Sequence, residues 1–162
     1  MNGDIKPYSE ILKDKYLEKL KRYCAYRDRC HQEVMDKIRS FNIDDDIAGI
    51  IVSELITEGY LNEERYAKSF VRGKYRINKW GRNKIIQNLK QKNISRYLID
   101  EALKEIIETE YLLNLKEILH KKNDTVKAKN KFEKRKKLFV FAYNKGYEAE
   151  LINDILDELI LY

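Results

Sequence analysis

Proline is nearly absent from this chain, and glycine and cysteine are scarce. Its 162 residues include one proline, six glycines and two cysteines. Because proline and glycine supply most tight turns, their scarcity argues against a protein of many strands joined by turns. Two cysteines do not make a disulfide framework, and they favour a reducing compartment. These absences favour an all-α protein located in the cytoplasm.

Long apolar runs are also missing. No segment approaches the roughly 18 apolar residues of a membrane span, and residues 1–8 lack the apolar core of a signal peptide. We therefore expect no membrane partner. Hydrophobic residues still make up 43% of the chain, enough for a folded core, while 37% are charged and predict a very polar exterior.

Residues that commonly act in catalysis or metal binding are few. The only histidines, His31 and His120, stand in no known ligand or acid–base spacing, and Cys24 and Cys30 do not match a zinc pattern. There is no glycine-rich phosphate loop and no nucleophile elbow. The aspartates at residues 44–46 form either a helix cap or a metal site, and the lack of nearby histidine or glutamate ligands favours the cap. We expect a binding protein rather than an enzyme, with no cofactor or metal.

The most informative pattern is an internal repeat of about fifty residues. Apolar positions in residues 34–55 recur 51 residues later and again after a further 53 residues. In each copy they follow helical spacing, break at Asn42, Asn93 or Gly146, and then resume. Asn and Gly tolerate the left-handed conformation that ends a helix. The repeat therefore predicts three stacked modules, each containing helix, tight turn and helix.

Each module is expected to hold three helices. We expect a flexible lead at residues 1–10 and modules at residues 11–61, 62–109 and 110–162, with further structural turns at Gly59 and Gly81. Asp44, Asn62 and Ser95 are placed to cap the helices that follow them. The fourth helix should start after Asn62, and the others are expected near residues 9–23, 31–41, 45–58, 82–92, 96–108, 111–122, 126–144 and 148–161.

Charge is segregated along the chain, whose net charge is +6. Residues 65–99 hold eleven lysines and arginines and no acidic residue, and residues 121–137 hold nine basic against two acidic residues. By contrast, residues 43–64 hold seven acidic residues and no basic ones. A merely solvated surface normally mixes signs. The blocks therefore predict an uncompensated basic stripe that suits a polyanionic or acidic partner.

The candidate binding residues are the basic side chains of these blocks. On the fourth helix, a helical wheel places five of them opposite the apolar face, while Lys74 points toward it. The full set is Arg65, Lys68, Arg72, Lys74, Arg76, Lys79, Arg82, Lys84, Lys90 and Lys92, with a second patch at Lys134, Arg135, Lys136 and Lys137. Trp80 is either an exposed anchor for a partner or a wedge between modules. Charge reversal at Arg72, Arg76 and Arg82 is expected to weaken binding without loss of helix.

Three stretches resemble a known family. Residues 55–71 (LITEGYLNEERYAKSFV) resemble the junction between the first two modules of RecX proteins, the bacterial regulators of the RecA recombinase. Residues 81–94 (GRNKIIQNLKQKNI) look like that family's corner glycine, basic helix and turn, and residues 97–103 (YLIDEAL) continue the match. The chain departs from the family pattern at Cys30, where a capping serine is usual, and at Asn42 and Asn93, which replace turn glycines.

The resemblance implies both a fold and a function. RecX proteins are elongated, curved, all-α arrays of tandem three-helix modules that lie along the groove of the RecA–DNA filament. The implied function is a non-enzymatic regulator, mainly an inhibitor, of filament growth, ATP hydrolysis and strand exchange in recombination, DNA repair and the SOS response. The implied partners are the RecA filament and, weakly and non-specifically, DNA. We expect a monomer.

Two alternatives stay open. Each repeat holds helix, short turn and helix, which also suits a DNA-binding module whose helix after the turn meets the DNA. The first and third modules place acidic residues such as Asp44 and Glu148 at that point, where phosphate repels them. Only the middle module, with Ser95 and Arg96, suits this role, so DNA binding of a non-specific kind is expected. The other alternative is a helical-repeat scaffold for a different protein.

Overall fold

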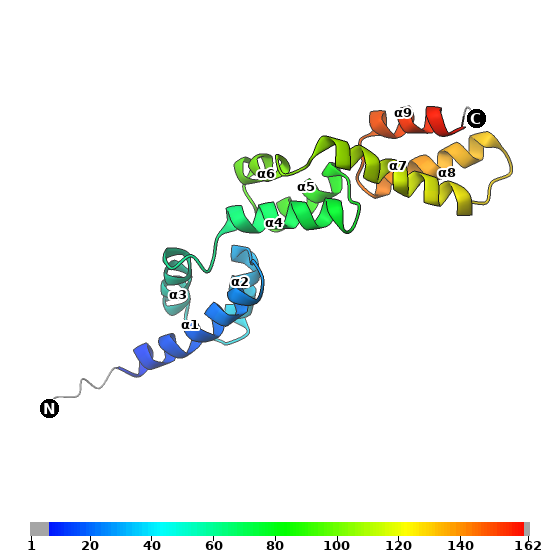
Figure 1. Ribbon diagram of the computed structural model, residues 1–162. Coiled ribbons are helices and arrows are strands. Elements are labelled where there is room, and N and C mark those ends of the chain that lie inside the picture. The colour runs from blue at the N-terminus through cyan, green and yellow to red at the C-terminus, as the bar shows by residue number, and fades with distance from the viewer. Residues whose placement is uncertain (1–6, 161–162) are drawn as a thin grey trace. The chain divides into compact units, whose positions relative to one another are not determined.

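The computed structural model describes residues 7–160 and is helical throughout, with no strand in that range, which confirms the all-α fold class (Figure 1). Residues 1–6 of the expected lead lie outside the described part of the chain. The chain divides into two compact units, residues 1–66 and 67–162. The described helices are α1 (Tyr8–Tyr26), α2 (His31–Arg39), α3 (Asp45–Thr57), α4 (Glu63–Arg76), α5 (Arg82–Gln91), α6 (Arg96–Leu103), α7 (Glu108–Thr125), α8 (Lys131–Asn144) and α9 (Ala149–Ile160).

In the first unit, α3 packs against both α1 and α2. The core takes one apolar stripe from each helix: Leu17, Leu20 and Cys24, then Val34 and Ile38, then Ala48, Ile51 and Leu55, with Leu61 beyond them. Asp44 caps α3, because its side chain accepts a hydrogen bond of 2.8 Å from the amide of Asp46. The cap interpretation of the aspartate run is therefore correct for Asp44.

The second unit contains most of α4 and all of α5 to α9. α5 packs on α6, and α8 packs between α7 and α9. Its largest fully buried side chains include Tyr75 of α4, Ile85 and Leu89 of α5, and Tyr111 of α7. The other two predicted caps also form, one at the start of α4 and one at the start of α6: Asn62 accepts a bond of 2.9 Å from the amide of Arg65, and Ser95 one of 3.3 Å from that of Leu98. Each cap fixes where its helix begins.

Equivalent positions of the internal sequence repeat are buried in all three copies. Val34, Ile85 and Leu138 occupy equivalent positions in the three copies, and all three are fully buried. One helical turn later, Ile38, Leu89 and Ala142 are buried as well. The three-helix organisation of the chain follows from this shared apolar pattern, while the module boundaries at residues 61 and 109 stay a prediction.

Four of the five expected turn residues adopt the left-handed backbone conformation. The φ angles are 50° at Asn42, 57° at Asn93, 77° at Gly59 and 95° at Gly146. Gly81 differs, because its φ of −79° is ordinary and it stands at the N-cap of α5. Glycine is required at this position for another reason, because the backbone of Gly146 lies too close to leave room for a side chain.

Four helix boundaries in the second half of the chain differ from the expected ones. α6 ends at Leu103 instead of 108, α7 spans Glu108–Thr125 instead of 111–122, and α8 begins at Lys131 instead of 126. Hydrogen bonds explain the start of α8. The Asn130 side chain accepts from the amide of Glu133 at 2.8 Å, and the Glu133 carboxylate accepts from the amide of Lys129 at 2.8 Å. This reciprocal cap fixes a start that the basic run of residues 126–137 concealed.

Candidate functional site

The cations along α4 lie beside carboxylates. The Arg72 guanidinium is 2.9 Å from a carboxylate oxygen of Glu105, and that of Arg76 is 3.2 Å from Glu110. Lys79, which follows α4, has its ammonium 3.3 Å from Glu117. The prediction of an uncompensated stripe is therefore wrong. Residues 65–99 lack acidic side chains, but carboxylates from residues 105–117 pair with Arg72, Arg76 and Lys79.

Arg65 and Lys68 lie at the first turns of the same helix. The Nε of Arg65 is 2.6 Å from the Asp28 carboxylate, and its guanidinium also donates to the carbonyl oxygens of Gly59 and Tyr60 at 3.0 and 3.2 Å. Arg65 thus ties the start of α4 to the turn before it. Lys68 is half-buried. The contacts of Arg65 with Asp28, Gly59 and Tyr60 give it a structural role.

Arg82 is the centre of a network that joins three helices of the second unit. Its guanidinium donates to Glu148 at 2.9 Å, forms an ion pair with Glu108, and lies 4.1 Å from the centre of the Tyr111 ring. The Tyr111 hydroxyl donates to Glu148 at 2.6 Å and accepts from the amide of Arg82 at 2.9 Å. Burial lowers the pKa of Arg82, but the hydrogen bonds to Glu148 and Glu108 raise it more. Charge reversal at Arg82 would place like charges together here, so we now expect it to disrupt packing rather than to leave helical structure intact.

Lys74 and Lys84 form a different arrangement around Trp80. Their ammonium groups lie 4.8 and 4.6 Å from the centre of the Trp80 ring, and Phe70 meets the same indole edge-on at 6.4 Å between ring centres. Among residues 7–160, neither lysine forms an ion pair with a carboxylate. An indole face attracts cations, so each lysine is held against this ring without a carboxylate partner. We call Lys74, Trp80 and Lys84 the Trp80 cluster.

The remaining candidates lie at α5 and on α8. Lys90 is exposed on α5, and Lys92 follows at the C-cap of that helix. In the second patch, Arg135 pairs with Asp157 of α9 at 2.7 Å, and Lys137 pairs with Glu133 at 2.7 Å. Within the described chain, Lys134 and Lys136 form no ion pair with a carboxylate. Neighbours in sequence on α8 thus have different partners and different local charge.

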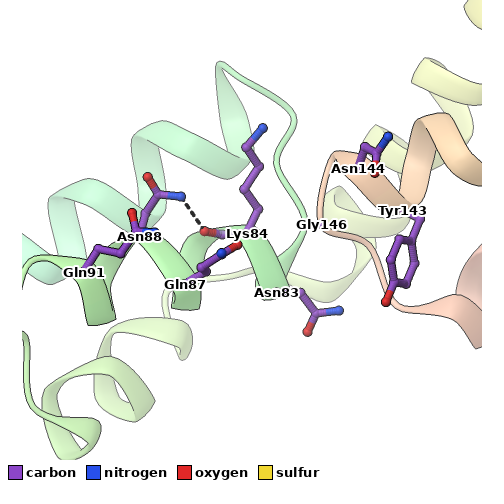
Figure 2. A pocket seen from close by; sticks show the side chains of 8 residues that line it. All are labelled: Asn83, Lys84, Gln87, Asn88, Gln91, Tyr143, Asn144 and Gly146. Atoms are coloured by element: carbon purple, nitrogen blue, oxygen red, sulfur yellow. Dashed lines mark hydrogen bonds between the residues drawn. The ribbon is translucent and has the colours of Figure 1, made fainter.

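A groove beside the Trp80 cluster was missed at the sequence level. Its volume is about 490 Å³, and it is lined by five residues on one face of α5 together with Tyr143 and Asn144 at the end of α8. Figure 2 shows the α5 side chains on the left and the end of α8 on the right, with Gly146 between them. Four of the α5 residues carry carboxamides, namely Asn83, Gln87, Asn88 and Gln91. Their helical spacing was visible in the sequence, but the opposing wall from α8 was not.

Among residues 7–160 there is no group of three or more His, Cys, Asp or Glu side chains placed to hold a metal ion. No described helix has the length and apolar character that crossing a membrane requires. His31 lies at the start of α2, with its Nδ1 3.8 Å from the Glu63 carboxylate, and His120 is exposed on α7.

Comparison with known families finds two adjoining matches. Residues 62–103 match RecX, second three-helix domain, and residues 108–156 match RecX, third three-helix domain. Together the matched segments cover more than half of the chain, and they include the Trp80 cluster, the Arg82 network and the groove.

Relatives and solved structures agree with the family matches. The chain is 28% identical over 152 residues to regulatory protein RecX of Bacillus mycoides and 26% identical to that of Bacillus cytotoxicus, in each case over 94% of this chain and 56% of the relative. It therefore spans about half the length of the curated relatives it matches. The crystal structure of RecX from Lactobacillus salivarius superimposes with a TM-score of 0.81 and 26% identity, covering 93% of this chain and 97% of that one. A second crystal structure, of regulatory protein RecX, has a TM-score of 0.83 at 20% identity, covers 92% of this chain and 73% of that one, and shows the shared fold.

Proposed function

Because the chain belongs to the RecX family of regulatory proteins, we propose that it regulates the RecA recombinase by binding the filament that RecA forms on DNA. Binding would mainly inhibit filament growth, ATP hydrolysis and strand exchange in recombination and DNA repair. The chain would act in the cytoplasm, as a monomer, through contacts rather than through catalysis of its own.

The observation that carries this proposal for the chain's own residues is the Trp80 cluster. Two lysines without a carboxylate partner in the described chain flank one half-buried indole. Tryptophan is among the residues that most often supply the binding energy of protein interfaces. An acidic group of the filament could replace the water around both ammonium groups at little cost to the fold.

The paired cations have a different expected role. Arg72 and Arg76 keep part of their side chains exposed, at 40% and 46%, and so can meet a partner while they hold Glu105 and Glu110. Their substitution would change binding and packing together. Lys74 and Lys84 are the better test positions, because no ion pair of the described chain is broken when they change.

The experiment measures DNA-dependent ATP hydrolysis by RecA against increasing concentration of this chain. The test variant carries Lys74→Glu and Lys84→Glu, and the control carries Lys15→Glu and Arg22→Glu, two exposed cations of α1 with no ion pair to a described residue. We expect the test variant to need at least about tenfold more protein for equal inhibition, corresponding to about 1.4 kcal/mol. The control should follow the unsubstituted chain. Equal inhibition by all three proteins at physiological salt would refute the assignment of the surface.

Weak binding to DNA is the second part of the proposal. Lys134 and Lys136 of α8 lack a carboxylate partner in the described chain and support it. Binding through phosphate contacts falls steeply with salt and is indifferent to sequence. Fluorescence anisotropy with two unrelated duplexes, repeated across a salt series, should give equal affinities that fall together. A preference for one duplex that persists at high salt would contradict non-specific binding.

A further inference from the structure

The groove along α5 has an unusual composition for this chain. Charged residues make up 37% of the sequence, but of the five groove residues on α5 only Lys84 is charged. The others present carboxamides, and Asn144 adds one more from the end of α8. Among the residues that the structure describes, no acidic side chain lines the groove. A solvated helix face of this protein would be expected to carry mixed charges instead.

These carboxamides have spare hydrogen-bonding capacity. The Nδ2 of Asn88 donates to the carbonyl of Lys84 at 2.8 Å, which orients that amide and leaves its oxygen available (Figure 2). Within residues 7–160, the side chains of Asn83, Gln87 and Gln91 form no hydrogen bond to the protein. Each therefore offers both a donor and an acceptor to an incoming group.

The spacing of these groups suits an extended peptide. A carboxamide pairs its oxygen and its NH₂ with the N–H and C=O of a main-chain amide, so a row of them recognises backbone more than side chains. From Asn83 to Gln91 the helix rises about 12 Å. An extended chain advances roughly 3.3 Å per residue, so about three or four residues fit along this row.

Charge selects the kind of peptide. Lys84 belongs both to the groove, near the Asn83 end of the carboxamide row, and to the Trp80 cluster, where its ammonium lies 4.6 Å from the centre of the indole ring. A carboxylate in the bound segment would pair with Lys84 at this end of the row. A basic segment would be repelled there.

We infer that this groove binds an extended acidic segment of a partner protein, with its main chain along the carboxamides and a carboxylate at Lys84. The inference deepens the proposed function, on which it rests for the identity of the partner, by naming the type of segment the partner presents. Nucleic acid is less suited, because its closely spaced phosphates call for several cations, and among the described residues Lys84 is the only cation that lines the groove.

The test uses the chain alone, so it does not require the recombinase. The probe is a fluorescein-labelled octapeptide of alternating aspartate and serine, compared with an octapeptide of alternating lysine and serine and with a 20-nucleotide oligothymidylate. Binding is followed by anisotropy and by the side-chain amide NMR signals of glutamine. The chain has three glutamines, so Gln32 in the other unit serves as an internal control for Gln87 and Gln91.

The acidic peptide should bind and should shift the signals of Gln87 and Gln91 but not that of Gln32. A Gln87→Ala, Gln91→Ala variant should bind it about tenfold more weakly, since two hydrogen-bonded pairs are lost. Lys84→Gln should weaken binding by a similar factor, whereas Lys90→Gln, on the same helix but outside the groove, should leave it unchanged.

Three results would overturn the inference: no binding of the acidic peptide, equal binding by the alanine variant, or binding of oligothymidylate alone at these glutamines. Failure of this test with intact inhibition of RecA would leave the proposed function in place. Peptide binding without any effect on RecA would instead refute the proposed function and leave the groove as a peptide-binding site.

Discussion

A Cβ atom on Gly81 would lie 2.2 Å from the carbonyl carbon of Gly146, far inside van der Waals contact. The two backbones meet through hydrogen bonds as well. The amide of Gly81 donates to the carbonyl of Lys145 at 2.8 Å, and the amide of Asn83 donates to that of Gly146 at 3.0 Å. The start of α5 is therefore joined to the turn after α8 by main-chain contact, which requires glycine on both sides.

The first prediction concerns this contact. Gly81→Ala should lower the free energy of unfolding by roughly 3 kcal/mol, because a buried methyl group would force the two backbones apart. Gly73→Ala is the matched control, since a Cβ there meets nothing within 4 Å and the residue lies inside α4. That variant should be more stable by about 0.5–1 kcal/mol. Urea unfolding followed by circular dichroism measures both, and equal stability of the two variants would contradict the account.

The second prediction compares two buried tyrosines. Tyr111 uses its hydroxyl fully, between Glu148 and the amide of Arg82, whereas the buried hydroxyl of Tyr147 has no hydrogen-bond partner among the described residues. Tyr111→Phe should lower the free energy of unfolding by about 1–3 kcal/mol, because it leaves buried polar groups unpaired. Tyr147→Phe should be neutral or stabilising by up to about 1 kcal/mol. Thermal unfolding measures both variants. Tyr111→Phe should unfold at a lower temperature than the unsubstituted chain, and Tyr147→Phe should not.

The third prediction concerns alkaline pH. Burial raises the pKa of Tyr66, Tyr111 and Tyr147 above the ordinary value of 10.0, assisted by the nearby charge of Glu33 at Tyr66 and of Glu148 at the other two. Above that pH the unfolded chain loses these protons and the folded chain keeps them. The contribution of these tyrosines to the free energy of unfolding is therefore fully present below pH 10. It falls as the pH rises further, by at most about 1.4 kcal/mol per pH unit for each tyrosine.

Absorbance at 295 nm tests this pH dependence directly. The buried Tyr66, Tyr111 and Tyr147 should ionise only together with loss of the helical signal. If these three tyrosines ionise with helical structure intact, burial does not control their ionisation.

Much of the fold could be predicted because it depends on local patterns. Apolar residues at helical spacing predicted the core positions of all three repeats, and single side chains such as Asp44 and Ser95 predicted helix starts. Predictions failed where the determinant was a reciprocal cap within a charged run, as at Asn130 and Glu133. They also missed the positive φ of Lys79, a residue type that gives no hint of it.

The candidate site was predicted less well, because charge along the chain is not charge in space. The block of residues 65–99 contains no carboxylate, yet Arg72, Arg76 and Arg82 all meet carboxylates from beyond it. Which cations stay without a carboxylate depends on tertiary contacts that no composition reveals. From the sequence, Trp80 was either an anchor or a wedge, and the two lysines that lie against its ring became a cluster only through the fold.

The central claim is that this chain binds the RecA filament through the Trp80 cluster. The most direct measurement is co-sedimentation of the chain with RecA assembled on single-stranded DNA with nucleotide, compared with RecA lacking both. The unsubstituted chain and the Lys15→Glu, Arg22→Glu control should sediment with the filament and not with free RecA. The Lys74→Glu, Lys84→Glu variant should stay in the supernatant with its helical spectrum unchanged. The account would be contradicted if the unsubstituted chain did not sediment with the filament, or if the Lys74→Glu, Lys84→Glu variant sedimented as fully as the unsubstituted chain.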